Sequence, residues 1–146
     1  MSGPFAFIPE SKTVIQPDVQ QSQGSGPDVH QDVYQDLAPQ VLRQRLVIEG
    51  YPASPISDVN IKDYLSKLSD FIGMTSLLEP VTHRSDRYGW AGWIHWETSG
   101  AHFYAWEQPL LFFSVDIYTC KAFNTHAALD FTRQYFATTR LCHKSL

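Results

Sequence analysis

The sequence of 146 residues lacks the features that define several classes of protein. Its 11 basic and 15 acidic residues give a net charge of −4, so it offers no basic stripe to neutralise the phosphates of a nucleic acid. Its only cysteines, Cys120 and Cys142, cannot make a disulfide framework. No apolar run approaches the ~20 residues of a membrane-spanning helix, and residues 1–10 lack the basic and apolar regions of a signal peptide. We therefore expect a cytoplasmic protein whose partner is a small molecule, not a nucleic acid or a membrane.

The first 40 residues are rich in Gln, Ser, Gly, Pro and Asp and show no apolar period. Such a segment buries too little surface to offset the entropy of ordering it. Residues 1–40 are therefore predicted to be a disordered tail, with a partner-docking arm as the alternative. The chain is 43% apolar and 14% aromatic, which is ample for one packed domain over residues 41–146.

Apolar spacing and capping residues predict the elements of that domain. They are, in order, a strand at 46–48 buried on both faces, a helix that Ser54 caps and Gly73 ends, a strand at 75–81, a solvated polar loop at 83–87, an aromatic strand at 89–97, two strands at 102–106 and 112–120, a helix that Asn124 caps and an edge strand at 138–142. This order predicts a two-layer α/β sandwich, in which an antiparallel sheet carries the helices on one face.

Two strands near the middle of the domain carry unusual chemistry on one side. Because strand side chains alternate between faces, one face of each strand should carry His102, Tyr104, Trp106, Ser114, Asp116, Tyr118 and Cys120. A face that only packs a hydrophobic core is not expected to carry an imidazole, an indole, a carboxylate and a thiol together, so this face is a candidate functional surface. Trp93 and Trp96, on the preceding strand, are interpreted as core residues.

Histidines are the obvious candidates for metal ligands. His83, His95 and His102, with Glu97, match no standard ligand spacing. No metal site is therefore predicted. A glycine-rich phosphate loop and the Ser-His-Asp order of known hydrolases are also missing from the sequence.

Ser99, Trp106 and the strand Asp116-Ile117-Tyr118-Thr119-Cys120 resemble the bacterial S-adenosylmethionine decarboxylase family over roughly residues 46–136. The family pattern is roughly Glu-Ser-His-x-x-x-His-Thr-Trp-Pro-Glu, followed by Asp-x-Phe-Thr-Cys. Members cut their own chain before that serine and convert it into a pyruvoyl group. The resemblance implies a lyase of polyamine and spermidine biosynthesis. It also implies a homodimer in which the exposed sheet faces its twin.

The resemblance implies a role for individual residues. Cleavage between Thr98 and Ser99 would make Ser99 the pyruvoyl precursor, and Cys120 would be the proton donor that replaces the lost carboxylate. His102 could stand in for the family histidine whose position Tyr104 occupies. An adenosyl sulfonium ligand needs aromatic plates and a carboxylate, and the candidates are Tyr88, Trp90, Trp106, Glu107 and Asp116.

Four positions depart from the family pattern. Thr98 replaces the glutamate before the serine, Gly100 the histidine after it and Tyr104 the histidine five positions beyond, while Ala91 falls near a family serine or threonine. The substrate could be S-adenosylmethionine or a related amino acid such as ornithine or arginine. Two alternatives stay open: an unprocessed homologue that binds S-adenosylmethionine or cleaves it by a different, lyase-type reaction, and a non-catalytic ligand-binding module.

Overall fold

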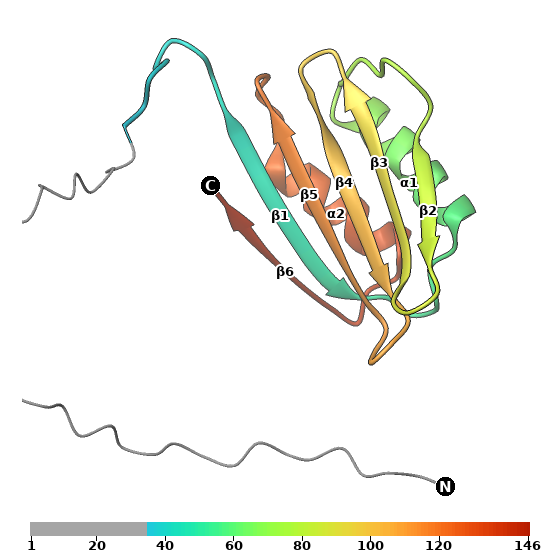
Figure 1. Cartoon of the computed structure of the whole chain (residues 1–146). Helices are drawn as coiled ribbons and strands as arrows, with labels where there is room; N and C mark the ends of the chain where they lie inside the picture. The colour runs from blue at the N-terminus through green and yellow to red at the C-terminus, as the bar shows by residue number, and fades with distance from the viewer. Residues whose placement is uncertain (1–34) are drawn as a thin grey trace, which may run out of the picture. The chain divides into compact units, whose positions relative to one another are not determined.

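Two helices and six strands follow one another along residues 35–146, the part of the chain that the computed structural model describes (Figure 1). The order is β1 (Gln44–Tyr51), α1 (Asp58–Phe71), β2 (Val81–Ser85), β3 (Gly89–Trp96), β4 (Ser99–Trp106), β5 (Phe112–Thr119), α2 (Thr125–Tyr135) and β6 (Arg140–Ser145). One compact unit spans Asp36–Leu146. The predicted tail lies outside the described residues as far as position 34, and its disorder stays a prediction.

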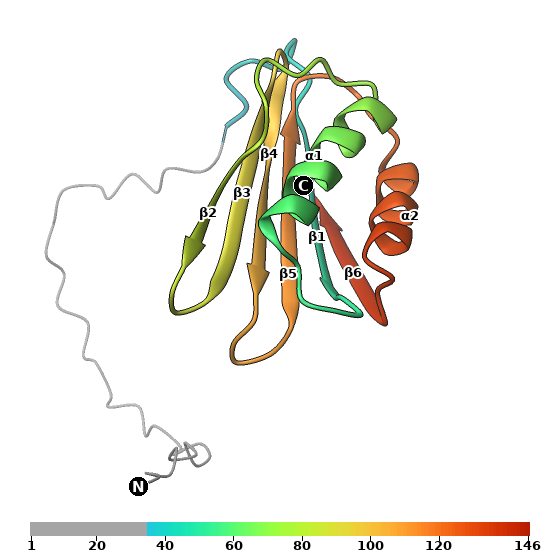
Figure 2. The ribbon, with the colours of Figure 1, turned by 90° about the vertical axis from the view of Figure 1, so that its right-hand side faces the viewer.

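The six strands form one antiparallel sheet in the order β2-β3-β4-β5-β1-β6. Both helices lie against the same face of this sheet, as Figures 1 and 2 show. Within the described residues no other element covers the opposite face, which we call the open face. The predicted two-layer α/β sandwich is confirmed. No helix in residues 35–146 combines the length and the apolarity needed to cross a membrane.

Strand alternation decides which side chains reach the helices. In β4 the buried residues are Ala101, Phe103 and Ala105, and in β5 they are Phe113, Val115 and Ile117. These side chains pack on the buried positions of α1 and α2, which are Ile61, Tyr64, Leu65, Leu68, Ala128 and Leu129. The alternate residues of both strands are consequently left on the open face.

Helix α1 begins later than predicted. Its N-cap is Ser57, not Ser54: the Ser57 hydroxyl accepts a hydrogen bond from the Asn60 N–H, and the Asn60 side chain accepts one from the Ser57 N–H. This reciprocal pair satisfies two backbone donors at the helix start, which Ser54 followed by Pro55 does not. Gly73 follows the helix with a φ of 71°, as expected for a residue that ends one.

Three other boundaries test the sequence reasoning. The predicted start of α2 is confirmed, because the Asn124 side chain accepts from the Ala127 N–H at 3.1 Å. The predicted strand at 75–81 and the polar loop at 83–87 are wrong, since β2 occupies Val81–Ser85 and the earlier segment makes only an isolated bridge from Ser76. An edge strand pairs on one side only and can be largely exposed, so a polar composition does not exclude it. The other edge strand, β6, begins two residues later than predicted.

Apolar residues divide between the two faces of the sheet in ways the sequence did not fully predict. Trp96 is buried as predicted, and its indole N–H donates to the Ser69 hydroxyl at 2.7 Å. Trp93 is not a core residue: it lies half-buried on the open face, its ring edge-on to that of His95. In β1 likewise, Val47 is only half-buried on the open face, so this strand is not buried on both faces.

Candidate functional site

The open face carries the side chains that the sequence singled out on β4 and β5. The alternation is confirmed: these side chains all lie opposite the helices, and Tyr104 and Tyr118 are each 43% exposed. The antiparallel register places them in rows across the strands, with His102 beside Asp116, Tyr104 beside Ser114 and Trp106 beside Phe112. The face is consequently polar and aromatic along its whole length.

Ser99 occupies a strained position at one end of this face. Glu97 and Thr98 form a two-residue turn between β3 and β4, in which Trp96 pairs with Ser99. Ser99 has a φ of 147°, a region that non-glycine residues rarely adopt. In this conformation the Ser99 hydroxyl lies against the carbonyl oxygen of Thr98, the residue before it. The nucleophile and the peptide bond predicted to be cut are therefore in contact.

The Thr98 peptide is held by the neighbouring end of β5. The backbone N–H of Cys120 donates to the Thr98 carbonyl oxygen at 3.0 Å. The Cys120 sulfur lies 3.8 Å from the Ser99 oxygen, and the Thr119 hydroxyl lies 3.3 Å from that of Thr98. Cys120 is exposed, so its thiol is open to a ligand on this face. Three predicted site residues, Thr98, Ser99 and Cys120, thus form one group.

Gly100 is required by the close approach of β3 and β4. A Cβ atom added at position 100 would lie 2.4 Å from the carbonyl oxygen of Ile94, which is an overlap with rigid backbone. The family histidine therefore has no room at this position. Gly100 pairs with His95 of β3 on one side and with Tyr118 of β5 on the other. No side chain of β4 therefore stands between the His95 imidazole and the Tyr118 phenol.

A hollow of about 230 Å³ lies at the other end of β4, beside the β2–β3 turn. Its lining residues are His83, Arg84, Ser85, Tyr88, Gly89, Trp90, Ala91, Tyr104, Ala105 and Trp106. Four residues predicted for the site, Tyr88, Trp90, Tyr104 and Trp106, are brought together there. Trp106 also lines a second, apolar hollow, with Tyr51, Pro109, Leu110 and Phe112. This end of the face is therefore the more aromatic one.

Arg84 is a residue of this hollow that the sequence reasoning missed. Its guanidinium lies 5.7 Å from the centre of the Trp90 ring and 3.5 Å from the Glu107 carboxylate. Glu107, predicted to bind substrate, is thus already paired with a cation. The run of five polar residues at 83–87 predicts a solvated loop, whereas Arg84 belongs to strand β2. Residues 83–87 are all polar and show no apolar alternation, so no local signal in the sequence identifies the strand that carries Arg84.

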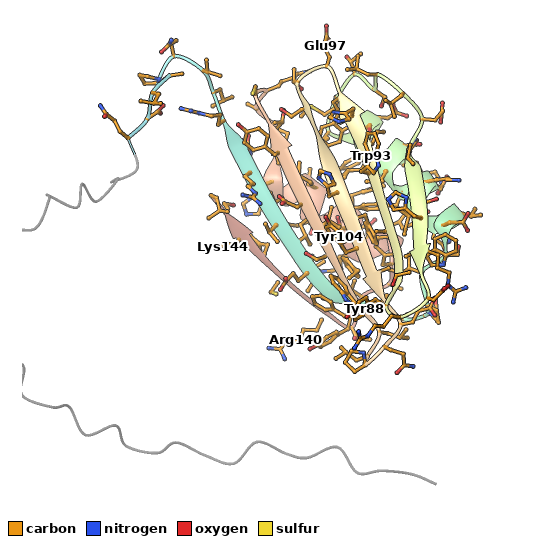
Figure 3. The ribbon with its side chains drawn as sticks, in the orientation of Figure 1. Tyr88, Trp93, Glu97, Tyr104, Arg140 and Lys144 are labelled. Atoms are coloured by element: carbon orange, nitrogen blue, oxygen red, sulfur yellow. The ribbon has the colours of Figure 1, made fainter. Side chains whose placement is uncertain are left out.

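The two ends of the open face are far apart. Trp106 is seven positions after Ser99 on β4, which at roughly 3.3 Å per residue is about 23 Å. Figure 3 shows Glu97 beyond one end of the strands, Tyr88 at the opposite end and Tyr104 between them. On the same scale Tyr104 is about 17 Å along β4 from Ser99 and His102 about 10 Å. One chain therefore does not bring all the predicted site residues together.

Asp116, in the middle of the face, forms a two-pronged ion pair. The Arg45 guanidinium donates to its two carboxylate oxygens at 2.9 and 2.7 Å. These bonds raise the pKa of Arg45 above its ordinary value, so its guanidinium stays charged. A substrate that bound Asp116 would have to share this carboxylate with Arg45. His102 lies in the same row, and its ring is parallel to that of Tyr104.

Metal ligation is the remaining question. Within residues 35–146, no group of three or more His, Cys, Asp or Glu side chains is arranged so that it could hold a metal ion. His83 and His95 lie on β2 and β3, and His102 on β4. The histidines of the open face are therefore available as single imidazoles.

Comparisons with known proteins agree with this fold. Residues 44–146 match the family model described as S-adenosylmethionine decarboxylase, which covers more than half of the chain. The fold is similar to the crystal structure of the adenosylmethionine decarboxylase from Aquifex aeolicus VF5, with a TM-score of 0.60. That likeness covers 73% of this chain and 89% of the other at 16% identity, so it shows the fold alone. The comparison with curated proteins gives no match.

Proposed function

The chain belongs to the S-adenosylmethionine decarboxylase family, and from that premise we propose that it cuts itself between Thr98 and Ser99. The pyruvoyl group so formed would decarboxylate S-adenosylmethionine, a step of polyamine biosynthesis, or a related amino acid such as ornithine or arginine. The observation that carries the proposal is the contact between the Ser99 hydroxyl and the Thr98 carbonyl.

Two further features of this peptide support self-cleavage. The Cys120 N–H, at 3.0 Å from the Thr98 oxygen, can stabilise negative charge on that oxygen when the carbonyl is attacked. The φ of Ser99 lies in a region that costs of the order of 1–3 kcal/mol for a residue with a side chain. Cutting the bond would release this strain. The residues around Ser99 therefore fit its conversion into a pyruvoyl group.

The proposed conversion of Ser99 needs only atoms of the chain itself and one water molecule. Attack forms a bond from the Ser99 oxygen to the Thr98 carbonyl carbon and breaks the peptide C–N bond, while the hydroxyl proton passes to the Ser99 nitrogen. Loss of the Ser99 Cα proton then expels the Thr98 carboxylate. Water replaces the nitrogen, which leaves as ammonia. A pyruvoyl carbonyl at this position supplies an electron sink for an α-amino acid.

Cys120 is the proposed proton donor for the carbon that loses carbon dioxide. Its sulfur lies 3.8 Å from the Ser99 oxygen and is exposed on the open face. A thiol so close to the converted residue can hold a proton and deliver it without a long relay. Lys121, next in the chain, does not compete for this role, since its ammonium donates to the Gly73 carbonyl at 2.6 Å.

The distance between the two ends of the open face favours a second copy of the chain. The aromatic end, with Tyr88 and Trp106, is about 23 Å along β4 from Ser99. A substrate of the size of S-adenosylmethionine does not bridge that distance within one chain. Two copies stacked face to face with opposed strands would bring the aromatic end of one over Ser99 of the other. We therefore propose a homodimer through the open face.

The departures from the family pattern favour a second candidate. Ala91 and Tyr104 pair across β3 and β4, and neither offers the hydroxyl or the imidazole of the family pattern. An unprocessed homologue would keep the aromatic hollow for S-adenosylmethionine. It would either cleave the ligand by a lyase-type reaction, with Tyr104 and His102 as polar catalysts, or bind it without catalysis.

The intact mass under denaturing conditions separates these candidates. For the proposed enzyme we expect two fragments that divide between Thr98 and Ser99, the second beginning with a pyruvoyl group. The Ser99→Ala variant should give one uncut chain of 16.6 kDa. An uncut wild-type chain would contradict self-cleavage and leave the second candidate. Decarboxylation that persisted in Ser99→Ala would contradict the pyruvoyl mechanism.

The proposed dimer predicts that a charge on the open face disrupts association. Tyr104→Glu would bury a carboxylate between the two sheets, which is strongly unfavourable without a partner. We expect sedimentation equilibrium to show weaker association, with a dissociation constant raised by at least about a hundredfold. Val59→Glu is the matched control, because Val59 is 67% exposed on α1, on the helical side. A monomeric wild type, or equal effects of the two variants, would contradict the interface.

A further inference from the structure

Self-cleavage needs a group that moves a proton at Ser99, and the family pattern does not supply one here. The Ser99 hydroxyl must lose its proton on attack, and the Ser99 nitrogen must gain one as the peptide bond breaks. Tyr104 replaces the family histidine by a phenol, and a phenol is a poorer proton acceptor than an imidazole. The relay must therefore involve another residue.

Few titratable side chains lie at the Ser99 end of the open face. Glu97 is in the turn, and its side chain points beyond the end of the sheet, away from the strands (Figure 3). Lys121 is engaged by the Gly73 carbonyl. Cys120 touches Ser99 but is needed, in the proposed function, as the acid of the later reaction. His95 and Tyr118, which flank Gly100, are the others.

The register of β3 and β4 brings His95 close to Ser99. His95 pairs with Gly100, and its neighbour Trp96 pairs with Ser99. Since Gly100 has no side chain, nothing on β4 stands between the imidazole and the Ser99 end of the face. Adjacent strands are roughly 4.8 Å apart, so the gap between β3 and β5 at this row is roughly 10 Å wide. That gap admits one water beside an imidazole.

The backbone around His95 is held in place by hydrogen bonds to the segment before β2. The His95 carbonyl accepts from the Leu77 N–H at 3.0 Å, and Glu97, in the turn two residues later, donates its N–H to the Thr75 carbonyl at 2.9 Å. The imidazole is exposed and lies edge-on to Trp93, with ring centres 5.0 Å apart. The backbone at His95 is therefore fixed, and the imidazole projects from it on the open face beside Trp93.

We propose that His95 is the proton-relay residue of self-cleavage, acting on Ser99 across the gap above Gly100. This inference rests on the proposed function. The imidazole accepts the proton of the Ser99 hydroxyl as the oxygen bonds to the Thr98 carbonyl carbon. It returns that proton to the Ser99 nitrogen as the C–N bond breaks, so no oxidant or other reactant is needed. His102, two residues farther along β4 and stacked on Tyr104, does not have this role.

The test follows self-cleavage in the full-length chain during cell-free translation, with the intact mass sampled over time. His95→Gly is expected to cut at least about tenfold more slowly than the wild type. Added imidazole should restore its rate in a concentration-dependent manner, because the small molecule can occupy the space that the side chain leaves. His143→Gly, the matched control at an exposed histidine of the edge strand β6, should cut at the wild-type rate with or without imidazole. The readout is the cut polypeptide and does not depend on decarboxylation.

A second variant guards against loss of folding. His95→Gln keeps the size of the side chain but cannot relay a proton as imidazole does, so we expect it to fold, to cut slowly and to gain nothing from imidazole. Wild-type rates in either His95 variant would overturn the inference and leave the proposed function intact. Slow cutting of His95→Gly that imidazole does not restore would also overturn it. An uncut wild type would overturn both proposals together.

Discussion

Replacing Gly100 with histidine, the residue of the family pattern, is expected to damage this protein rather than improve it. The new Cβ atom would lie 2.4 Å from the Ile94 carbonyl oxygen, and a backbone atom of a paired strand cannot move aside as a flexible side chain can. We expect a loss of about 3 kcal/mol or more in the free energy of unfolding, at the upper end of what overpacking costs. Urea unfolding measures it, in a Ser99→Ala background so that all chains are uncut.

Gly73→Ala is the matched control for this substitution. Gly73 also has a positive φ, of 71°, but nothing lies within 4 Å of an added Cβ atom. Only the conformational cost then applies, which is about 1 kcal/mol. Equal losses in the two variants would show that β3 and β4 do not approach each other at Gly100 as closely as described. A Gly100→His protein as stable as its parent would refute the steric argument outright.

Replacing Cys120 with alanine is expected to have the largest effect on catalysis. The thiol is the proposed proton donor and lies 3.8 Å from the Ser99 oxygen. Loss of a general acid typically lowers a rate by about 10²–10⁴-fold. We therefore expect decarboxylation of S-adenosylmethionine, measured as released carbon dioxide per cut chain, to fall by at least about a hundredfold. Self-cleavage should survive, because the Cys120 backbone N–H remains to hold the Thr98 carbonyl.

Cys142→Ala provides the comparison for Cys120→Ala. Cys142 is the other free cysteine, exposed on β6, where it lines a separate hollow with Glu49 and Arg140. We expect it to leave both self-cleavage and decarboxylation at wild-type levels. A Cys120→Ala enzyme with more than about a tenth of the wild-type rate would contradict the role of the thiol as acid. Equal losses in both variants would point to a general effect of cysteine loss on the sheet.

Local patterns in the sequence were enough to predict the layers of this protein. The alternation through 102–106 and 112–120 correctly assigned each side chain to the helical or the open face, because strand side chains alternate whatever the strand pairs with. The cap at Asn124 was equally local, a side-chain oxygen that meets an N–H three residues on. The residues around Ser99, Trp106 and Cys120 were enough to indicate the family, which the match over residues 44–146 confirmed.

Features that depend on contacts between distant residues could not be predicted in this way. Ser54 and Ser57 are both plausible caps, and only the bond with Asn60 decides for Ser57. The segment at 83–87 is polar and resembles a loop until β3 is available to pair with it. For the same reason Arg84 was missed, although it contacts both Trp90 and Glu107.

The sequence by itself determined the family, the two-layer fold and the row of reactive side chains on β4 and β5. Only the tertiary structure decided which groups surround Ser99. Its hydroxyl meets the Thr98 carbonyl because β5 runs alongside and supplies the Cys120 N–H, and because β3 approaches so closely that position 100 must be glycine. Those are distances between strands, and strand pairing is set by the packing of the whole sheet, not by neighbours along the chain.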